Sequence, residues 1–229
     1  MKKFSLFLVS LILFLEVSAQ DKRYVSLSLG MAIPKGEFAS TDLYENGGFA
    51  KTGANFDVGF SYLLNPDFAI GVVLRAQTHG LDAQNMSDQL QTSNMVTAGK
   101  WSMIAFMAGW NASLPITEKL EFDFSMVGGI ANFYNPELRI SYLSPGGEWK
   151  VIVGQGSTFS PAVLFGIGFK YDIAASTFLL MKGDLLVSKA EFDNLKFIST
   201  YPSAMTIFGN SLEQKITTVS VKVGVGFRF

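Results

Sequence analysis

The sequence has no cysteine and only one histidine among its 229 residues. Without cysteine the chain can form no disulfide framework and no thiolate metal site, and it offers no cysteine for lipid attachment. Lysine and arginine number 18 against 19 acidic residues, and no dense basic cluster occurs, so we expect no nucleic-acid partner. The sequence also shows no cofactor motif, since GQG at 154–156 lacks the Lys and Ser/Thr of a phosphate loop.

The first 19 residues are predicted to be a cleaved signal peptide. Lys2 and Lys3 form a charged start, residues 4–15 are an apolar run, and Val17-Ser18-Ala19 provides small residues for cleavage. A membrane anchor is the alternative, but a spanning helix needs roughly 20 apolar residues and this run has about a dozen. We therefore expect one exported domain over residues 20–229.

Downstream of the signal, no apolar run approaches the length of a spanning helix, and apolar residues recur mostly at every second position. In an extended strand, positions two apart share a face, so stretches such as RYVSLSLGMA and VSVKVGVGFRF are apolar on one side. The pattern predicts eight strands, near 23–32, 54–64, 68–77, 101–114, 120–132, 159–173, 178–188 and 215–229.

The connections between these strands alternate in length. Tight turns are predicted at 65–67, 115–118 and 174–177, and long polar connections at 33–51, 78–100, 133–158 and 192–214. The long ones run to roughly 20 residues, where connections in compact soluble domains have about 4–6. Short turns on one side and long loops on the other are typical of an outer-membrane barrel. The fold class predicted is all-β, an eight-stranded antiparallel up-and-down transmembrane barrel.

The apolar face suits lipid, because strands of about 9–11 tilted residues cross the hydrocarbon layer and a closed ring leaves no backbone group unpaired. A soluble lipocalin-like barrel, with the apolar face turned inward, is the alternative fold. Aromatic residues near strand ends favour a membrane girdle. Those predicted for the periplasmic girdle are Tyr62, Phe68, Trp110, Phe122, Tyr171 and Phe229, with Trp101 and Phe159 at the outer rim.

With its export signal, eight alternating strands and terminal VGVGFRF, the chain resembles the small outer-membrane β-barrel proteins of Gram-negative bacteria, the OmpA-like, OmpX-like and OmpW-like porin family. The resemblance covers about residues 20–229. It implies a location in the outer membrane and contact with outer-membrane lipid. It also implies that Val225, Phe227 and Phe229 form a carboxyl-terminal signal for the barrel assembly machinery. We expect a monomer.

The polar face of the strands predicts the barrel interior. It carries five acids and five bases, and an eight-stranded barrel has room for little besides side chains, so we expect paired charges and a packed polar core. A narrow channel or a lateral transporter for small apolar solutes is the alternative function. The predicted interior charges are Asp57, Arg75, Glu121, Asp123, Lys170, Asp172, Lys182, Asp184, Lys222 and Arg228.

An enzyme is the other class considered, since outer-membrane lipid hydrolases use a histidine with a serine near the outer rim. The single histidine, His79, follows the third strand, with Thr78, Asp82 and Ser87 near it in sequence. No serine shares its face two positions away, and a lone loop histidine is usually solvated. We therefore expect no catalysis, no cofactor and no metal site. Features specific to this protein are expected in the long loops.

Overall fold

The computed structural model describes residues 22–43, 46–90, 96–144, 147–200 and 205–229. The predicted signal peptide, residues 1–19, lies outside these ranges, as do loop residues Tyr44 and Tyr201. Within them, no helix is long and apolar enough to cross a membrane.

Eight long strands form a closed antiparallel ring, as the sequence predicts. Neighbours along the ring are consecutive wall strands, and the last strand pairs with both the one before it and the first, which closes the barrel. The wall strands are β1 (Arg23–Lys35), β2 (Gly53–Asn65), β3 (Phe68–Gly80), β5 (Lys100–Pro115), β6 (Leu120–Tyr134), β9 (Ser157–Ala174), β10 (Thr177–Ser199) and β11 (Met205–Arg228).

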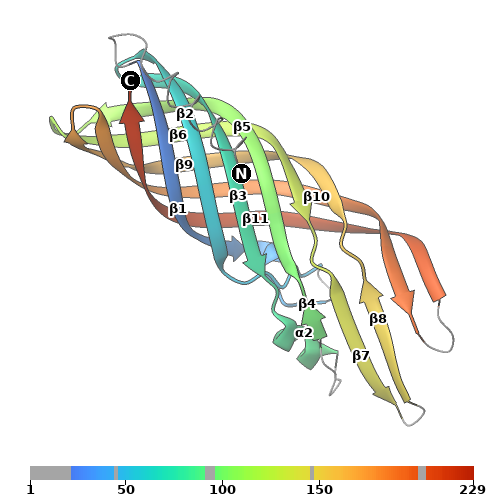
Figure 1. Cartoon of the computed structure of the whole chain (residues 1–229). Helices are drawn as coiled ribbons and strands as arrows, with labels where there is room; N and C mark the ends of the chain where they lie inside the picture. Colours follow the sequence, from blue (N-terminus) through green and yellow to red (C-terminus); the bar gives the residue numbers. More distant parts are fainter. Residues whose placement is uncertain (1–21, 44–45, 91–95, 145–146, 201–204) are drawn as a thin grey trace, which may run out of the picture.

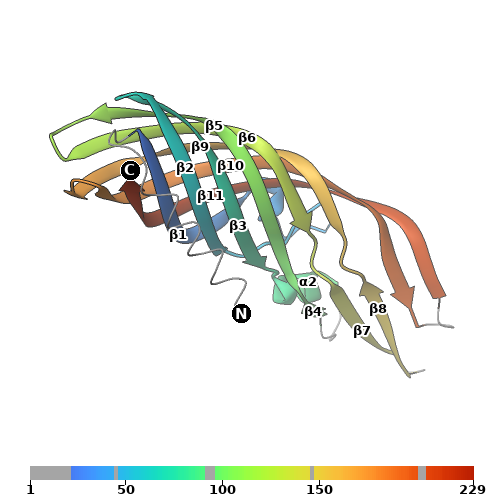
Figure 2. The ribbon, with the colours of Figure 1, turned by 45° about the horizontal axis from the view of Figure 1, so that its top comes forward.

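The two ends of the barrel differ, which Figures 1 and 2 show from two angles. The three short turns, β2–β3, β5–β6 and β9–β10, lie at the same end as the carboxyl terminus. Here the ring is tied at the chain ends, because Arg23 N–H donates to Phe229 O at 3.2 Å and Phe229 N–H donates to Arg23 O at 2.9 Å. The long connections gather at the opposite end.

The long connections contain more regular structure than the sequence indicates. They hold η2 (Gly36–Phe38), α2 (Ala83–Gln89), β4 (Val96–Ala98), β7 (Leu138–Ser144) and β8 (Gly147–Val153). The predicted loop at 192–214 is wrong for most of its length, because β10 and β11 continue past the barrel and pair as far as Ser199 and Met205. β8 pairs with the outer part of β10, and β7 and β4 follow, so the sheet extends beyond the ring.

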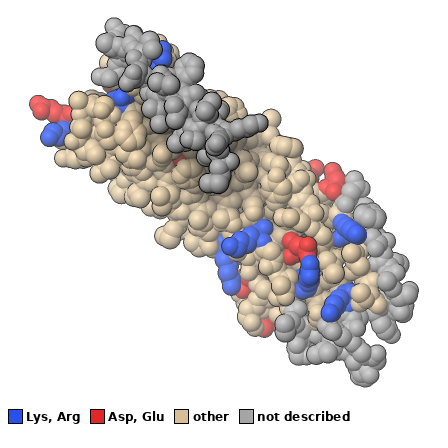
Figure 3. Space-filling view, viewed as in Figure 1, with Lys and Arg blue, Asp and Glu red and all other residues tan. Residues whose placement is uncertain are grey.

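The outer face of the wall is an uncharged apolar belt. Outward side chains such as Leu29, Phe106 and Ile167 are 64%, 60% and 54% exposed, far more than an isolated soluble domain needs to show. Between Arg23 at one rim and Lys35, Lys100, Lys189 and Lys215 at the other, the outward positions of the described wall strands hold no acidic or basic residue. In Figure 3 the charged groups accordingly gather toward the two ends.

The interior is divided into two zones, where the sequence predicts a single polar core. The half nearer the short turns holds the charged side chains beside a small apolar cluster of Tyr24, Phe178 and Leu180. The half nearer the long connections holds a larger hydrophobic cluster together with buried polar side chains such as Gln77 and His79. Trp101 belongs to that cluster at 5% exposure, so its predicted place in the outer aromatic girdle is wrong. The members include Phe38, Trp101, Met103, Met107, Phe133, Leu164, Leu186, Phe192 and Ile216.

Candidate functional site

The centre of the barrel holds an ion quartet, formed by Asp57, Arg75, Asp184 and Lys222. Arg75 is fully buried and binds both carboxylates as a fork: Nε and Nη2 donate to Asp57 at 2.8 Å, while Nη1 and Nη2 donate to Asp184 at 2.9 and 2.8 Å. Lys222 contacts both acids as well. Two full charges of each sign therefore cancel, which a low-dielectric interior requires.

Two of the four ion pairs in the quartet connect strands that are not neighbours in the ring. Arg75 lies on β3 and Asp184 on β10, so their contact crosses the barrel, while Lys222 of β11 reaches past β1 to Asp57 of β2. The alternation of side chains along each strand turns all four inward. The quartet therefore spans the barrel from one side of the wall to the other, and its charges sum to zero.

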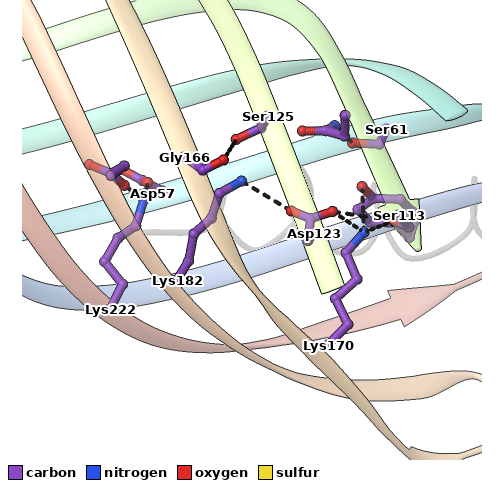
Figure 4. Close-up of polar contacts among 12 residues, drawn as sticks. Asp57, Ser61, Ser113, Asp123, Ser125, Gly166, Lys170, Lys182 and Lys222 are labelled. Atoms are coloured by element: carbon purple, nitrogen blue, oxygen red, sulfur yellow. Dashed lines mark hydrogen bonds and ion pairs between the residues drawn. The ribbon is translucent and has the colours of Figure 1, made fainter. Parts of the chain in front are cut away.

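A second cluster is centred on Asp123, nearer the short turns. Lys170 and Lys182 approach its carboxylate from β9 and β10 at 2.6 and 3.3 Å (Figure 4). Lys170 also donates to the Ser113 hydroxyl at 2.9 Å and lies 3.5 Å from the Tyr24 hydroxyl. One acid here faces two bases, which leaves one positive charge in excess.

The third group, at the short-turn mouth, has the opposite excess. Arg228 contacts Asp172 at 2.6 Å and Glu121 at 3.4 Å, and its guanidinium stacks over the Phe178 ring at 4.8 Å. The three charged side chains are part-buried, and Glu121, Arg228 and Phe178 line a small cavity of about 130 Å³. With two acids and one base, this group offsets the excess positive charge of the Asp123 cluster. All ten predicted interior charges lie inside the barrel, and together they sum to zero.

His79 also lies inside the barrel, whereas the sequence predicts a solvated loop residue. It is 3% exposed, with Nδ1 at 2.9 Å from Lys51 O and Nε2 at 2.7 Å from the Gln77 side-chain amide. Both ring nitrogens therefore have partners, and neither partner is a hydroxyl. The His79 ring meets the Phe38 ring edge-on, with the ring centroids 5.1 Å apart, and points away from the lipid-facing surface.

The described parts of the connection from 36 to 50, residues 36–43 and 46–50, carry two aromatic side chains that pack in the outer end of the barrel. Phe38 and Phe49 are at most 2% exposed, and the Phe38 ring meets Trp101 edge-on at 5.5 Å. Trp101 Nε1 donates to Gly48 O at 2.9 Å, which ties the connection to β5. We call this group, Phe38, Phe49 and Trp101, the aromatic plug. The sequence marks Phe38 and Phe49 only as loop aromatics, and strict alternation from Ile104 along β5 would have placed Trp101 inward.

Several buried polar atoms lie between the quartet and the plug without a protein partner in the described structure. They include both side-chain polar atoms of Asn55, Gln77 Oε1 and Ser220 Oγ. Within the described ranges, no group of three or more His, Asp or Glu side chains is placed to hold a metal ion.

Other residues predicted for the girdle face outward. Tyr62, Tyr171 and Phe159 are 37%, 46% and 74% exposed. Phe68 stacks on Trp110 at 5.7 Å, and Phe122 meets Phe169 at 5.5 Å. At the chain end, Val225 and Phe227 continue the outward row of β11 opposite Leu27 and Val25 of β1. These positions suit a girdle and an exposed carboxyl-terminal strand.

Comparison with known proteins gives structural likeness without sequence likeness. No protein-family model and no curated protein matches the chain. Among solved structures, Neisserial surface protein A is similar at 11% identity, covering 93% of this chain and 100% of that one, with a TM-score of 0.43. Ail of Yersinia pestis is similar at 13% identity, covering 91% of this chain and 99% of that one, with a TM-score of 0.43. A major outer membrane protein from Thermus thermophilus is similar at 11% identity, covering 90% of this chain and 99% of that one, with a TM-score of 0.46.

The fold and the interior together define a class. A closed eight-stranded ring with an uncharged apolar exterior and buried, neutralised charges is a small β-barrel of the transmembrane kind.

Proposed function

We propose that this chain is a monomeric, non-catalytic outer-membrane β-barrel that is closed to solutes and displays its long connections at the cell surface. The observation that carries the proposal is the inversion of the barrel: apolar side chains cover its outside while charged side chains are buried within. Water would favour the reverse arrangement, whereas a bilayer favours this one. Outer-membrane lipid is then the medium around the belt, and the barrel assembly machinery is the partner during insertion.

Two barriers in series support a closed interior. The ion quartet crosses the barrel at its centre, and the aromatic plug fills the outer mouth. Eight strands enclose a space about as wide as their own side chains, so a solute would have to displace both barriers. A structural or surface role therefore fits better than a narrow channel.

The lateral-transport alternative would need an opening in the wall. The pairing of β10 with β9 and with β11 runs without a register shift from Phe178 to Ser188. Shifts on the ring lie at the short turns, near Asn65 and Thr177, or in the outer extension beyond Phe192. This continuity favours a sealed wall. A lipid-modifying role for His79 is likewise disfavoured, because the ring faces the interior.

Fractionation and conductance together test the proposal. The processed protein should sediment with outer membranes and migrate more slowly on gels after boiling than before. Purified and reconstituted in planar bilayers, it should pass neither sugars nor steady ion current. Proteinase added to intact cells should cleave the long connections and leave the wall intact. A folded, detergent-free protein in periplasmic extract would overturn the membrane location, and steady channels would overturn the closed interior.

A further inference from the structure

The lipid-facing side of β10 contains a notch. Its outward row reads Leu179, Met181, Gly183, Leu185, so one position has no side chain. Gly183 is flanked across the sheet by Ile167 of β9 and Val221 of β11. A Cβ atom added at Gly183 would meet only Ser220 O, at 3.8 Å, so the space above it is open. A hollow of about 360 Å³ lies here, walled by residues such as Phe165 and Leu185.

A second hollow, of about 310 Å³, lies along the same strand toward the short turns. Leu179, Met181 and Tyr171 line it, with Val223 on the β11 side. Both hollows follow the outward row of β10. Met181, 55% exposed, lies on this row between Gly183 of the first hollow and Leu179 of the second. We call the two hollows together the β10 furrow.

The chemistry of the furrow is that of a hydrocarbon. From Phe178 to Ser188, β10 is paired with β9 on one edge and β11 on the other, so its backbone offers no strand edge to a partner. The outward side chains around it are apolar, which leaves dispersion as the only attraction available. A polar ligand or an added strand would find nothing to bind.

The position of the furrow points to one side of the membrane. Gly183 lies six residues from Thr177 at the short turn and six from Lys189 at the outer rim, and is therefore near mid-membrane. The second hollow continues from there toward the short-turn rim, where Tyr171 lies. An acyl chain that enters from that leaflet would occupy the second hollow, pass beside Met181 and reach the first hollow at Gly183.

We propose that the β10 furrow is a binding site for one acyl chain of a phospholipid in the leaflet on the short-turn side. The inference rests on the proposed membrane location. A second copy of this chain fits less well, because a stable protein interface covers about 800 Å² on each partner and the furrow is bounded by a few side chains. A chain held on three sides exchanges more slowly than lipid on a smooth wall.

Two glycine substitutions provide a matched test. Gly183→Leu fills the notch, while Gly128→Leu adds the same side chain at an outward glycine of β6, where a Cβ would also meet only a backbone oxygen at 3.8 Å. The full-length protein, reconstituted with phosphatidylethanolamine and then extracted into detergent, is analysed by native mass spectrometry for retained lipid. Wild type and Gly128→Leu should retain one phospholipid. Gly183→Leu should retain about tenfold less, through loss of roughly a dozen carbon–carbon contacts.

The outcomes separate this proposal from the proposed function. Equal phospholipid retention in all three proteins, or no retention in any of them, overturns the furrow site. The membrane location is unaffected by that result if the protein is a heat-modifiable barrel in the outer-membrane fraction. A dimer in wild type that Gly183→Leu abolishes assigns the furrow to a second copy and also overturns the proposal. Absence of the protein from the membrane fraction overturns both.

Discussion

The guanidinium of Arg75 and the carboxylate of Asp184 form a two-point contact, at 2.8 and 2.9 Å, across the inside of the barrel. Neither side chain reaches solvent. The pair thereby joins the third strand of the chain to one near its end, 109 residues later.

Removing Arg75 should destabilise the barrel strongly. Arg75→Leu leaves Asp57 and Asp184 with only Lys222 between them, and breaking a buried ion pair costs about 3–5 kcal/mol. We expect the free energy of unfolding in detergent to fall by that amount. Unfolding is measured by the gel shift across a series of urea concentrations. Arg139→Leu is the control, because its pair with Glu137 is exposed and should contribute at most about 1 kcal/mol. Similar losses of unfolding free energy in the two variants would show that the quartet stabilises the barrel no more than an exposed ion pair does.

Trp101→Phe should loosen the connection over the outer mouth. The substitution keeps an aromatic ring against Phe38 but removes the hydrogen bond to Gly48 O, with a net cost of about 1 kcal/mol. We expect faster proteolysis within residues 36–50, measured on the folded protein. Trp110→Phe changes the same residue type on the lipid-facing side and should leave that rate unchanged. An unchanged rate in both variants would contradict the role given to the plug.

A charge in the middle of the belt should be costly. Phe106→Arg places a cation near mid-membrane, where the cost in a transmembrane barrel is about 2–4 kcal/mol. Ile116→Arg places it at a short turn, where about 0–1 kcal/mol is expected. Unfolding of the two variants in lipid vesicles gives the comparison. Equal, small effects would mean that water, and not lipid, covers Phe106.

Phe229→Ala should impair assembly in the cell more than stability of the folded barrel. Its backbone hydrogen bonds to Arg23 do not depend on the side chain, so ring closure is retained. We expect a smaller heat-modifiable fraction in cells, and unchanged unfolding of protein refolded from urea. If both readouts fell together, the aromatic ring would be a packing element and not an assembly signal.

The sequence predicts the wall well, because lipid on one side and charges on the other give a clear two-residue period. Lys222 and Val221, for example, can each be assigned a side from their neighbours alone. On β5 the contrast between the two faces weakens, since Trp101, Met103 and Met107 are buried in the hydrophobic cluster while Ile104 and Phe106 face outward. Hydropathy alone does not separate two apolar faces. The girdle prediction for Trp101 used its ring type and its place near a strand end, and not the alternation counted from Ile104, which is why it is wrong.

Contacts between distant segments explain the remaining differences. The outer parts of β10 and β11 are strands because they pair with each other and with β8, and no local pattern in 192–214 reveals those pairings. The ten interior charges could be assigned to the inside from alternation. Their grouping into a quartet and two clusters of opposite excess depends on barrel register, which connects Asp57 to Lys222 across β1.

The equality of five acids and five bases inside the wall also constrains how this protein can change over generations. Losing either sign at a single position creates an unbalanced ion in a medium that tolerates none. Replacements at Asp57, Arg75, Asp184 or Lys222 must therefore occur as compensated exchanges, whereas a position of the outward belt can exchange one apolar residue for another without a partner change. Related chains should show correlated replacement at these four positions.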